Sequence, residues 1–271
     1  MAGFKRCLAV LFLGLVAAIG GVDSLSGGEA FRVDTELFQN QDKKPFSEQL
    51  TIFTAGGTVY DFCLTAPQEV TVFDPRRGVF TLLNEQKQIK ATVTTQELLD
   101  FCLAFETQAA QEKHTLFAFC AAPQFETSEK EIDRNGQTII ELRLAAKPLT
   151  YVAEGQRFEH PEAVKAYRHF ADWCARLNAT CGNPSAARLE LNQALADRDL
   201  LPLEITRTIP PELPLGKKLE TRSQHRVNWA LSREDQKKID QAGNMMAQFQ
   251  LVSYDEYRRI PKTDASKQAK R

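Results

Sequence analysis

The stretch from Phe31 to Thr94 most constrains the fold, because short runs of β-forming residues alternate there with tight turns. One turn reads Asp74-Pro75-Arg76-Arg77-Gly78, and the order of Asp first, Pro second and Gly last is typical of a type I turn. Loops this short connect antiparallel strands, since a parallel pair requires a crossover of about a dozen residues or more. The stretch therefore predicts an antiparallel β-meander.

Helices are predicted after the meander. Thr94 and Glu97 form the T-x-x-E pattern of a capping box, which predicts a helix over about residues 95–112. Pro161 and Pro184 each have the position of a first helical residue, and they predict a pair of helices. Ser232 is placed to cap a last helix.

Two further patterns predict strands in the second half of the chain. Asn135-Gly136 lies between two strand-like runs, which is the strongest short-range signal of a hairpin. From Leu219 to Leu231, residues that face the interior alternate with polar and charged residues, and this period of two predicts one long strand.

Together these patterns predict an α+β fold, in which amphipathic helices cover a curved antiparallel β-meander and a helix pair is added to it. We predict a signal peptide over 1–30, a single α+β domain over 31–260 (β-rich 31–154, helix pair 161–200, strand and helix 203–250) and a flexible basic tail over 261–271.

The first 30 residues predict export. Two cations precede the apolar run Leu8–Gly20, and small residues follow it, as in a secretory signal peptide. The run is shorter than the roughly 20 residues that span a membrane. We expect cleavage near Ala30, with Ala18 or Gly21 as alternatives, and a periplasmic or extracellular protein without a transmembrane segment in its mature chain.

The formal net charge is −1, which argues against nucleic acid as a partner, because such proteins carry a strong basic surface. The basic residues that cluster near the end of the chain predict a solvated tail; they are Lys262, Lys267, Lys270 and Arg271.

The cysteine pattern leaves at least one thiol unpaired. Five cysteines follow the predicted signal peptide, and an odd number cannot pair completely. Cys174 and Cys181 are the candidate disulfide. Seven helical residues span about 10.5 Å, and a disulfide needs Cα atoms within about 7 Å, so this bond requires that the helix ends between them. Cys102 and Cys120 lie in apolar patterns that favour buried, unreactive thiols.

No known catalytic motif is present. The chain lacks the phosphate-loop, dinucleotide, nucleophile-elbow and zincin patterns, and we predict no catalytic residue, no cofactor and no metal. The densest group of potential metal ligands is Glu159, His160, Glu162 and His169. We interpret it as the start of a helix, because His160 and His169 are more than two helical turns apart.

One face of the strand over 219–231 contains the candidates for lining a pocket, which are His225, Val227 and Trp229. The alternative interpretation of His225 is a hydrogen-bonded histidine of the core.

Three segments of the meander resemble strand pairs of exported bacterial proteins related to the periplasmic outer-membrane lipoprotein carrier: Thr58–Phe62, Val70–Pro75 and Gly78–Leu83. In that family an aromatic-Asp-Pro turn joins two strands, as Phe73-Asp74-Pro75 does here. The family usually opens with a helix, whereas this chain has the strand-like Phe31–Asp34. The resemblance implies a curved sheet with an apolar concavity for an acyl chain, and it assigns no functional residue.

The order of the predicted elements and the Tyr254-x-x-Tyr257 pattern also look like uncharacterised secreted bacterial proteins of similar length. Our first hypothesis is an exported, non-enzymatic protein that binds a lipid, an acyl chain or an envelope protein on its curved sheet. The alternative is a hydrolase of unrecognised type that uses dispersed carboxylates such as Asp61, Asp74 or Glu204, and a third is a structural envelope protein. An apolar cavity would favour the binding protein. Two carboxylates about 5 to 9 Å apart in a cleft would favour the hydrolase, and a filled concavity would favour the structural protein.

Overall fold

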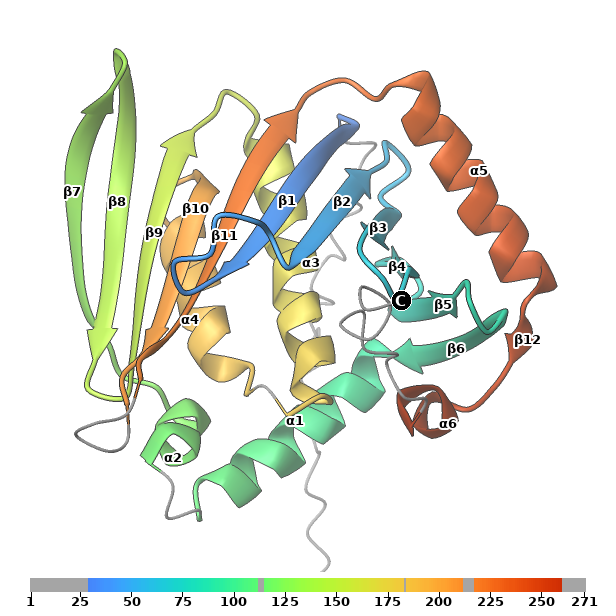
Figure 1. Ribbon diagram of the computed structural model, residues 1–271, viewed down its shortest axis with the longest axis horizontal. Helices are drawn as coiled ribbons and strands as arrows, with labels where there is room; N and C mark the ends of the chain where they lie inside the picture. The colour runs from blue at the N-terminus through green and yellow to red at the C-terminus, as the bar shows by residue number, and fades with distance from the viewer. Residues whose placement is uncertain (1–28, 112–114, 183, 212–216, 260–271) are drawn as a thin grey trace, which may run out of the picture.

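The computed structural model describes residues 29–111, 115–182, 184–211 and 217–259. The predicted signal peptide, up to residue 28, and the predicted basic tail lie outside the described residues. The described chain folds into one curved sheet of twelve strands with six helices, so the fold is α+β as predicted (Figure 1). None of the helices within these ranges is long and apolar enough to cross a membrane.

The sheet is antiparallel except at one edge, where β12 and β6 run parallel. Its spatial order is β12-β6-β5-β4-β3-β2-β1-β11-β10-β9-β8-β7, so β1 and β11 join the N-terminal meander to the later strands. In chain order the strands are β1 (Phe31–Gln39), β2 (Ser47–Phe53), β3 (Val59–Cys63), β4 (Glu69–Asp74), β5 (Val79–Asn84), β6 (Ile89–Thr94), β7 (Glu126–Arg134), β8 (Gln137–Ala146), β9 (Leu149–Arg157), β10 (Leu200–Ile209), β11 (Leu219–Asn228) and β12 (Gln250–Leu251).

Helices pack on both faces of the sheet. The inner face, as we name it, is the one on which α3 and α4 lie, and the outer face is the one that contacts α5. The helices are α1 (Thr95–Ala109), α2 (Thr115–Ala121), α3 (Pro161–Ala179), α4 (Ala186–Ala196), α5 (Arg233–Gln248) and α6 (Tyr254–Arg259).

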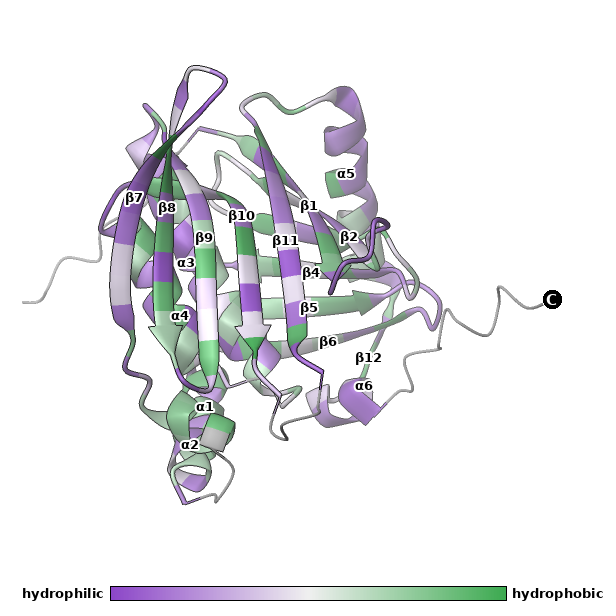
Figure 2. Ribbon diagram, turned by 60° about the vertical axis from the view of Figure 1, so that its left-hand side comes forward, coloured by the Kyte–Doolittle hydropathy of each residue, from purple (hydrophilic) through white to green (hydrophobic). Residues whose placement is uncertain are grey.

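Local signals correctly predict several boundaries. Thr94 and Ser232 each form a capping box at the start of a helix. Asn135 and Gly136 have φ angles of 57° and 80° in the turn between β7 and β8, as a two-residue hairpin turn requires. β7 forms one edge of the sheet and is mostly hydrophilic (Figure 2). Its charged side chains discourage pairing with another strand.

An aromatic row crosses one end of the inner face. Its members lie directly opposite one another on neighbouring strands and are all buried. Phe31 and Phe53 stack with ring centroids 4.3 Å apart, and Phe170 of α3 meets the Phe53 ring edge-on at 5.7 Å. The row therefore fixes α3 against the sheet through aromatic contacts. Its members are Phe31, Phe53, Val59, Phe73, Phe80 and Val93.

The buried carboxylate of Asp235 links α5 to β1, the first strand of the sheet. Asp235 is 1% exposed, and it accepts hydrogen bonds from the backbone and hydroxyl of Ser232. It also accepts a hydrogen bond from Arg32 of β1, with a distance of 3.0 Å between Nη1 and Oδ1. These bonds hold the pKa of Asp235 below its usual value, against the effect of burial.

We expect Asp235→Ala to lower the free energy of unfolding by about 2 kcal/mol, because it removes the helix cap and a charged partner of Arg32. Urea unfolding measures the change. Glu234→Ala is the matched control, since Glu234 is exposed on the same helix and pairs only with Lys237 at the surface. Equal stability of the two variants would contradict this role of Asp235.

Candidate functional site

The inner face contains an open cavity beside the aromatic row. Its volume is about 480 Å³, and it lies between α3 and the strands β1, β2, β3, β4 and β11, with Arg188 of α4 in its wall. Phenylalanine and valine side chains form the aromatic row, whereas mostly polar side chains of the sheet line the cavity. From the sheet these include Thr35, Ser47, Gln49, Thr51, Asp61, Cys63, Glu69, Thr71, Ser223 and His225.

Strand register explains why the inner face changes from apolar to polar. Inward positions recur every second residue, so Asp61 follows Val59 of the aromatic row on β3. Asp61 lies opposite Thr51 on one side and Thr71 on the other, which produces a row of polar side chains across three strands. This cavity differs from the apolar concavity that the resemblance to lipoprotein carriers implies.

Asp61 is a partly buried carboxyl group that lines the cavity. Its Oδ1 accepts a hydrogen bond of 2.7 Å from the hydroxyl of Thr51. Burial raises the pKa of Asp61 to about 6, while the hydrogen bond from Thr51 acts in the opposite direction. No lysine or arginine in the described part of the chain forms an ion pair with Asp61. A carboxylate has acceptor sites for about four hydrogen bonds, so most of its capacity remains for a molecule in the cavity.

His225 also lines the cavity, but both of its ring nitrogens have protein partners. Nδ1 lies 3.1 Å from the hydroxyl of Thr35, and Nε2 lies 2.9 Å from the hydroxyl of Ser223. Burial, together with the positive charge of Arg188, lowers the pKa of His225 to about 3. The neutral ring therefore orients two hydroxyl groups in the wall of the cavity.

The other two candidate lining residues have packing roles. Val227 packs against the core cluster that contains the aromatic row. Trp229 packs against the same cluster and contacts the rings of Phe31, Phe158 and His160.

Arg188 brings a positive charge to the cavity. Its Nε donates a 2.9 Å hydrogen bond to Asn192, which in turn donates to Asp172. The charge of Arg188 lowers the pKa values of Tyr167 and Cys174, whereas Asp61 raises them; burial dominates, and both values are raised overall. Two side chains of α3 thus lie within the influence of both charges.

A second hollow adjoins the cavity, and we name it the vestibule. Its volume is about 310 Å³, and it shares Glu69, Thr71, Leu177 and Asn178 with the cavity. Its other wall is α6. Tyr257 of α6 donates a 3.4 Å hydrogen bond to Glu69. The short helix α6 therefore forms one wall of the vestibule, beside the cavity.

α6 is also attached to the end of α3. The hydroxyl groups of Tyr254 and Thr180 lie 2.6 Å apart, and Arg258 donates a hydrogen bond to the carbonyl oxygen of Thr180.

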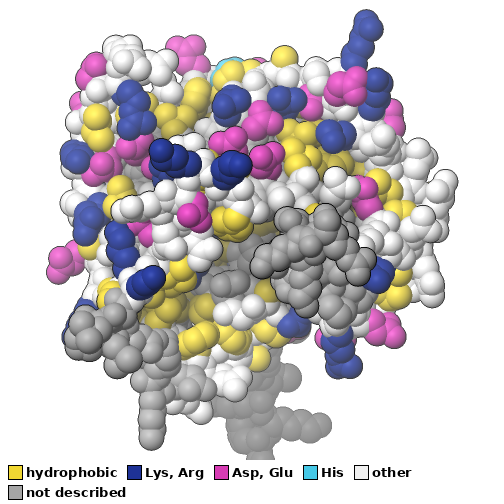
Figure 3. Space-filling view, viewed as in Figure 1, with side chains coloured by type: hydrophobic (Ala, Val, Ile, Leu, Met, Phe, Trp, Pro, Cys, Tyr) yellow, Lys and Arg dark blue, Asp and Glu magenta, His cyan; other side chains and the backbone are white. Residues whose placement is uncertain are grey.

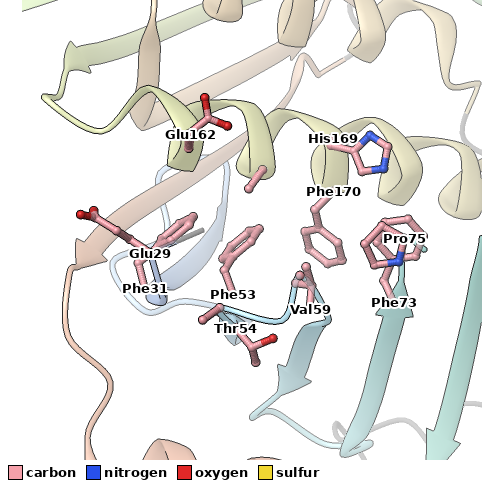
Figure 4. Close-up of a pocket in the computed structure, with 13 residues that line it drawn as sticks. Glu29, Phe31, Phe53, Thr54, Val59, Phe73, Pro75, Glu162, His169 and Phe170 are labelled. Carbon is pink, nitrogen blue, oxygen red and sulfur yellow. The ribbon is translucent and has the colours of Figure 1, made fainter. Parts of the chain in front are cut away.

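The potential metal ligands near the start of α3 do not converge on one point. Figure 4 shows Glu29 and Glu162 at one end of a small pocket of about 50 Å³ and His169 at the other. His160 instead stacks on Trp229 and pairs with Glu29. Among the described residues, no three His, Cys, Asp or Glu side chains are placed to hold a metal ion.

The three dispersed carboxylates do not converge. Asp74 accepts hydrogen bonds from the backbone of Arg76 and Arg77, as its turn requires. Glu204 bonds to Gln224, which lies between the inward-facing Ser223 and His225 and hence on the outer face. Asp61 alone of the three lines the cavity.

The candidate disulfide pair, Cys174 and Cys181, is present in the structure as two free thiols. α3 continues past Cys174 as far as Ala179, so Cys174 lies within the helix and Cys181 lies beyond its end. Burial raises the pKa of Cys174 well above its usual value, whereas Cys181 is exposed and lines the vestibule.

We expect alkylation of the unreduced, denatured protein to modify both Cys174 and Cys181. In the native protein Cys181 should react much faster, because Cys181 is exposed, whereas Cys174 is only partly exposed and its thiolate is disfavoured. Peptide mapping by mass spectrometry measures both results. A cross-linked peptide pair that appears only without reductant would show that Cys174 and Cys181 form a disulfide.

We expect Asp61→Asn to stabilise the protein at pH 8 by about 1–3 kcal/mol, because an amide has no charge to desolvate and still accepts the Thr51 hydrogen bond. Asp61 has a higher pKa folded than unfolded, so its stabilising contribution is complete below about pH 4 and is lost as the pH rises through 6. Urea unfolding between pH 4 and 8 should therefore show the two proteins diverging with pH. His225 is present in both proteins, so its effect on the free energy of unfolding cancels when the two are compared. If the free energies of unfolding of the two proteins change with pH in parallel, the prediction is wrong.

No protein-family model matches the chain, and no curated protein matches it. Two crystal forms of PNGF-II are similar at 9% identity, with TM-scores of 0.37 and 0.38; they cover 83% of this chain but 31% and 32% of PNGF-II. The chain thus spans about a third of the length of PNGF-II.

A LolA superfamily protein from Nitrosomonas europaea, which belongs to the lipoprotein-carrier group that the sequence resembles, is similar at 4% identity and a TM-score of 0.24. The match covers 77% of this chain and 89% of that protein. This similarity is distant, and no family supports the predicted kinship with uncharacterised secreted proteins. These comparisons assign no residue and no ligand to the cavity.

Proposed function

We propose that this protein binds a small polar molecule in the cavity beneath α3. The observation that carries the proposal is a cavity of about 480 Å³ lined by the partly buried Asp61 and the polar side chains around it. Ligand sites of proteins have volumes of about 300–1,000 Å³ and combine apolar walls with a few placed polar groups. Buried carboxyl groups with a shifted pKa also cluster at functional sites.

The polar lining favours a polar ligand over an acyl chain. An alkyl chain beside Asp61, Thr51 and Gln49 would exclude water from these groups and return no hydrogen bond. Each such group costs about 1–3 kcal/mol when it is buried without a partner. We therefore replace the expected lipid with a ligand that donates and accepts hydrogen bonds.

The outer surface offers less support for a charged macromolecular partner. Figure 3 shows Lys and Arg side chains interspersed with Asp and Glu side chains over the visible face. The formal net charge of −1 agrees with this mixture. We place the function in the cavity, and the signal-peptide pattern supports binding in the periplasm or outside the cell.

A hydrolase is the second candidate, and one observation favours it. Asp61 lies opposite Thr71, and Glu69 is two residues from Thr71 on the same strand, so the two carboxyl residues are diagonal neighbours with Cα atoms about 7–8 Å apart. A raised carboxyl pKa beside a second carboxylate is typical of glycosidases. Hydrolysis of a nitrophenyl glycoside that is lost in both Asp61→Asn and Glu69→Gln would support this candidate.

We expect the protein purified from its own source to retain a small polar molecule, which native mass spectrometry followed by denaturing extraction identifies. Ala171→Leu should abolish this retention, because Ala171 lines the cavity and a larger side chain occupies ligand volume. Ala104→Leu is the matched control, since Ala104 is exposed on α1.

A retained fatty acid, or equal retention by both alanine variants, would overturn the proposal. Thermal unfolding with the small-molecule fraction of source cells provides a second measurement for a ligand that dissociates during purification. That fraction should raise the Tm of the wild-type protein and of Ala104→Leu, but not that of Ala171→Leu. No shift in any of the three would also count against the proposal.

A further inference from the structure

Two opposite charges line the same cavity without pairing. Asp61 accepts one hydrogen bond, from Thr51, and Arg188 donates from Nε to Asn192. In the described part of the chain, the terminal guanidinium nitrogens of Arg188 have no protein acceptor, and Arg188 forms no ion pair with Asp61. Charges that leave water are normally compensated by direct pairing. A bound molecule can compensate both.

The two charges lie on opposite sides of the cavity. Asp61 is on β3, whereas Arg188 is on α4, whose Leu191 packs in one core cluster with Ile205 of β10. In the order β3-β2-β1-β11-β10, three strand spacings, or about 14 Å, separate β3 from β11, which lies next to β10. Tyr167 and Cys174 of α3 also line the cavity, and the charges of both Asp61 and Arg188 influence their pKa values. The space between the charges is wider than one amino acid.

The wall between the two charges offers hydrogen bonds to peptide groups. Thr35 and Gln49 lie opposite each other on β1 and β2, and both line the cavity. Their hydroxyl and amide groups can donate to a carbonyl oxygen and accept from an N–H group. Thr35 also bonds to His225, whereas an alkyl spacer would return no hydrogen bond to the amide of Gln49.

On the basis of the proposed function, we infer that the ligand is a short zwitterion, a peptide of two or three residues, with its ammonium group on Asp61 and its carboxylate on Arg188. An extended residue spans about 3.3–3.6 Å. A peptide of two or three residues therefore fills most of the space between Asp61 and Arg188 that their own side chains do not span. Guanidinium and carboxylate groups form strong paired hydrogen bonds.

Other ionisable groups around Asp61 are compatible with an ammonium ligand. Glu69 of β4 adds a second carboxyl group to that side of the cavity, and it accepts a hydrogen bond from Tyr257 of α6. Tyr167 and Cys174 of α3 are neutral at pH 7, because burial raises both pKa values, and Cys63 of β3 accepts or donates only weak hydrogen bonds. The positive charge is on the other side of the cavity, on Arg188.

The test is isothermal titration calorimetry at pH 7.5 with glycine, diglycine and triglycine. We expect the wild-type protein to bind triglycine at least tenfold more tightly than glycine. N-acetyl-triglycine and triglycinamide each lack one charge, and each should bind at least tenfold more weakly than triglycine. 6-Aminohexanoate is a zwitterion without peptide groups and should also bind more weakly.

Variants assign each end of the peptide. Asp61→Asn should lose the preference for triglycine over its N-acetyl form, and Arg188→Gln should lose the preference for triglycine over its amide. Glu204→Gln and Arg226→Gln make the same changes of charge on the outer face and should keep both preferences. Thermal unfolding confirms that each variant is folded before titration.

The outcomes separate this inference from the function on which it rests. If a polar molecule is retained but the capped peptides bind as tightly as triglycine, or both variants keep both preferences, the zwitterion is wrong and small-molecule binding stands. Binding of 6-aminohexanoate as tight as that of triglycine would overturn the peptide assignment alone. If no peptide binds and no polar molecule is retained from the source, both proposals fail.

Discussion

The contact between α3 and the aromatic row is the interaction on which the rest of the structure depends. Phe170 reaches the rings of Phe53 and Phe73, and these rings belong to strands that alternate apolar and polar inward positions. Large rings hold the helix away from the sheet at this end. The smaller polar side chains further along the same strands cannot fill the space beneath the helix, so a cavity remains there. The contact between α3 and the aromatic row thus stabilises the inner face and also leaves the cavity beside it unfilled.

The cavity has an energetic cost that a purely structural role does not explain. A carboxyl group whose pKa burial raises to about 6 destabilises the folded protein at neutral pH, and Thr51 offsets only part of this effect. Nearby, the hydroxyl groups of Thr35 and Ser223 both pair with His225, which shows that this fold can pair its polar groups. Residues that lower stability while facing an internal space are typical of functional sites, where activity and stability compete. The cavity therefore has the properties of a binding site.

The sequence predicted the parts of the fold that local chemistry determines. The capping boxes at Thr94 and Ser232 and the Asn135-Gly136 turn each depend on a few adjacent residues, and the structure contains all three. The cavity depends instead on strand register and on pairs such as β1 with β11, which are distant in sequence. His225 and Asp61 were recognised as individual candidates, but Glu69 and Arg188 were missed, because nothing in their neighbourhoods shows that they face the same space. Cys174 and Cys181 are both free thiols, because α3 continues past Cys174 as far as Ala179 and keeps Cys174 within the helix.

The position of α6 bears on how a ligand reaches the vestibule beside the cavity, because α6 forms one wall of that vestibule. α6 contains no buried residue, and hydrogen bonds from Tyr254 and Arg258 to Thr180 and from Tyr257 to Glu69 help to attach it. An element with little buried apolar surface opens at a lower free energy than the core strands, so local opening is much more frequent than global unfolding. The Tyr257 bond ends on Glu69, which belongs to both the vestibule and the cavity. A molecule that binds beside Glu69 therefore lies next to the hydrogen bond that helps to hold α6 in place.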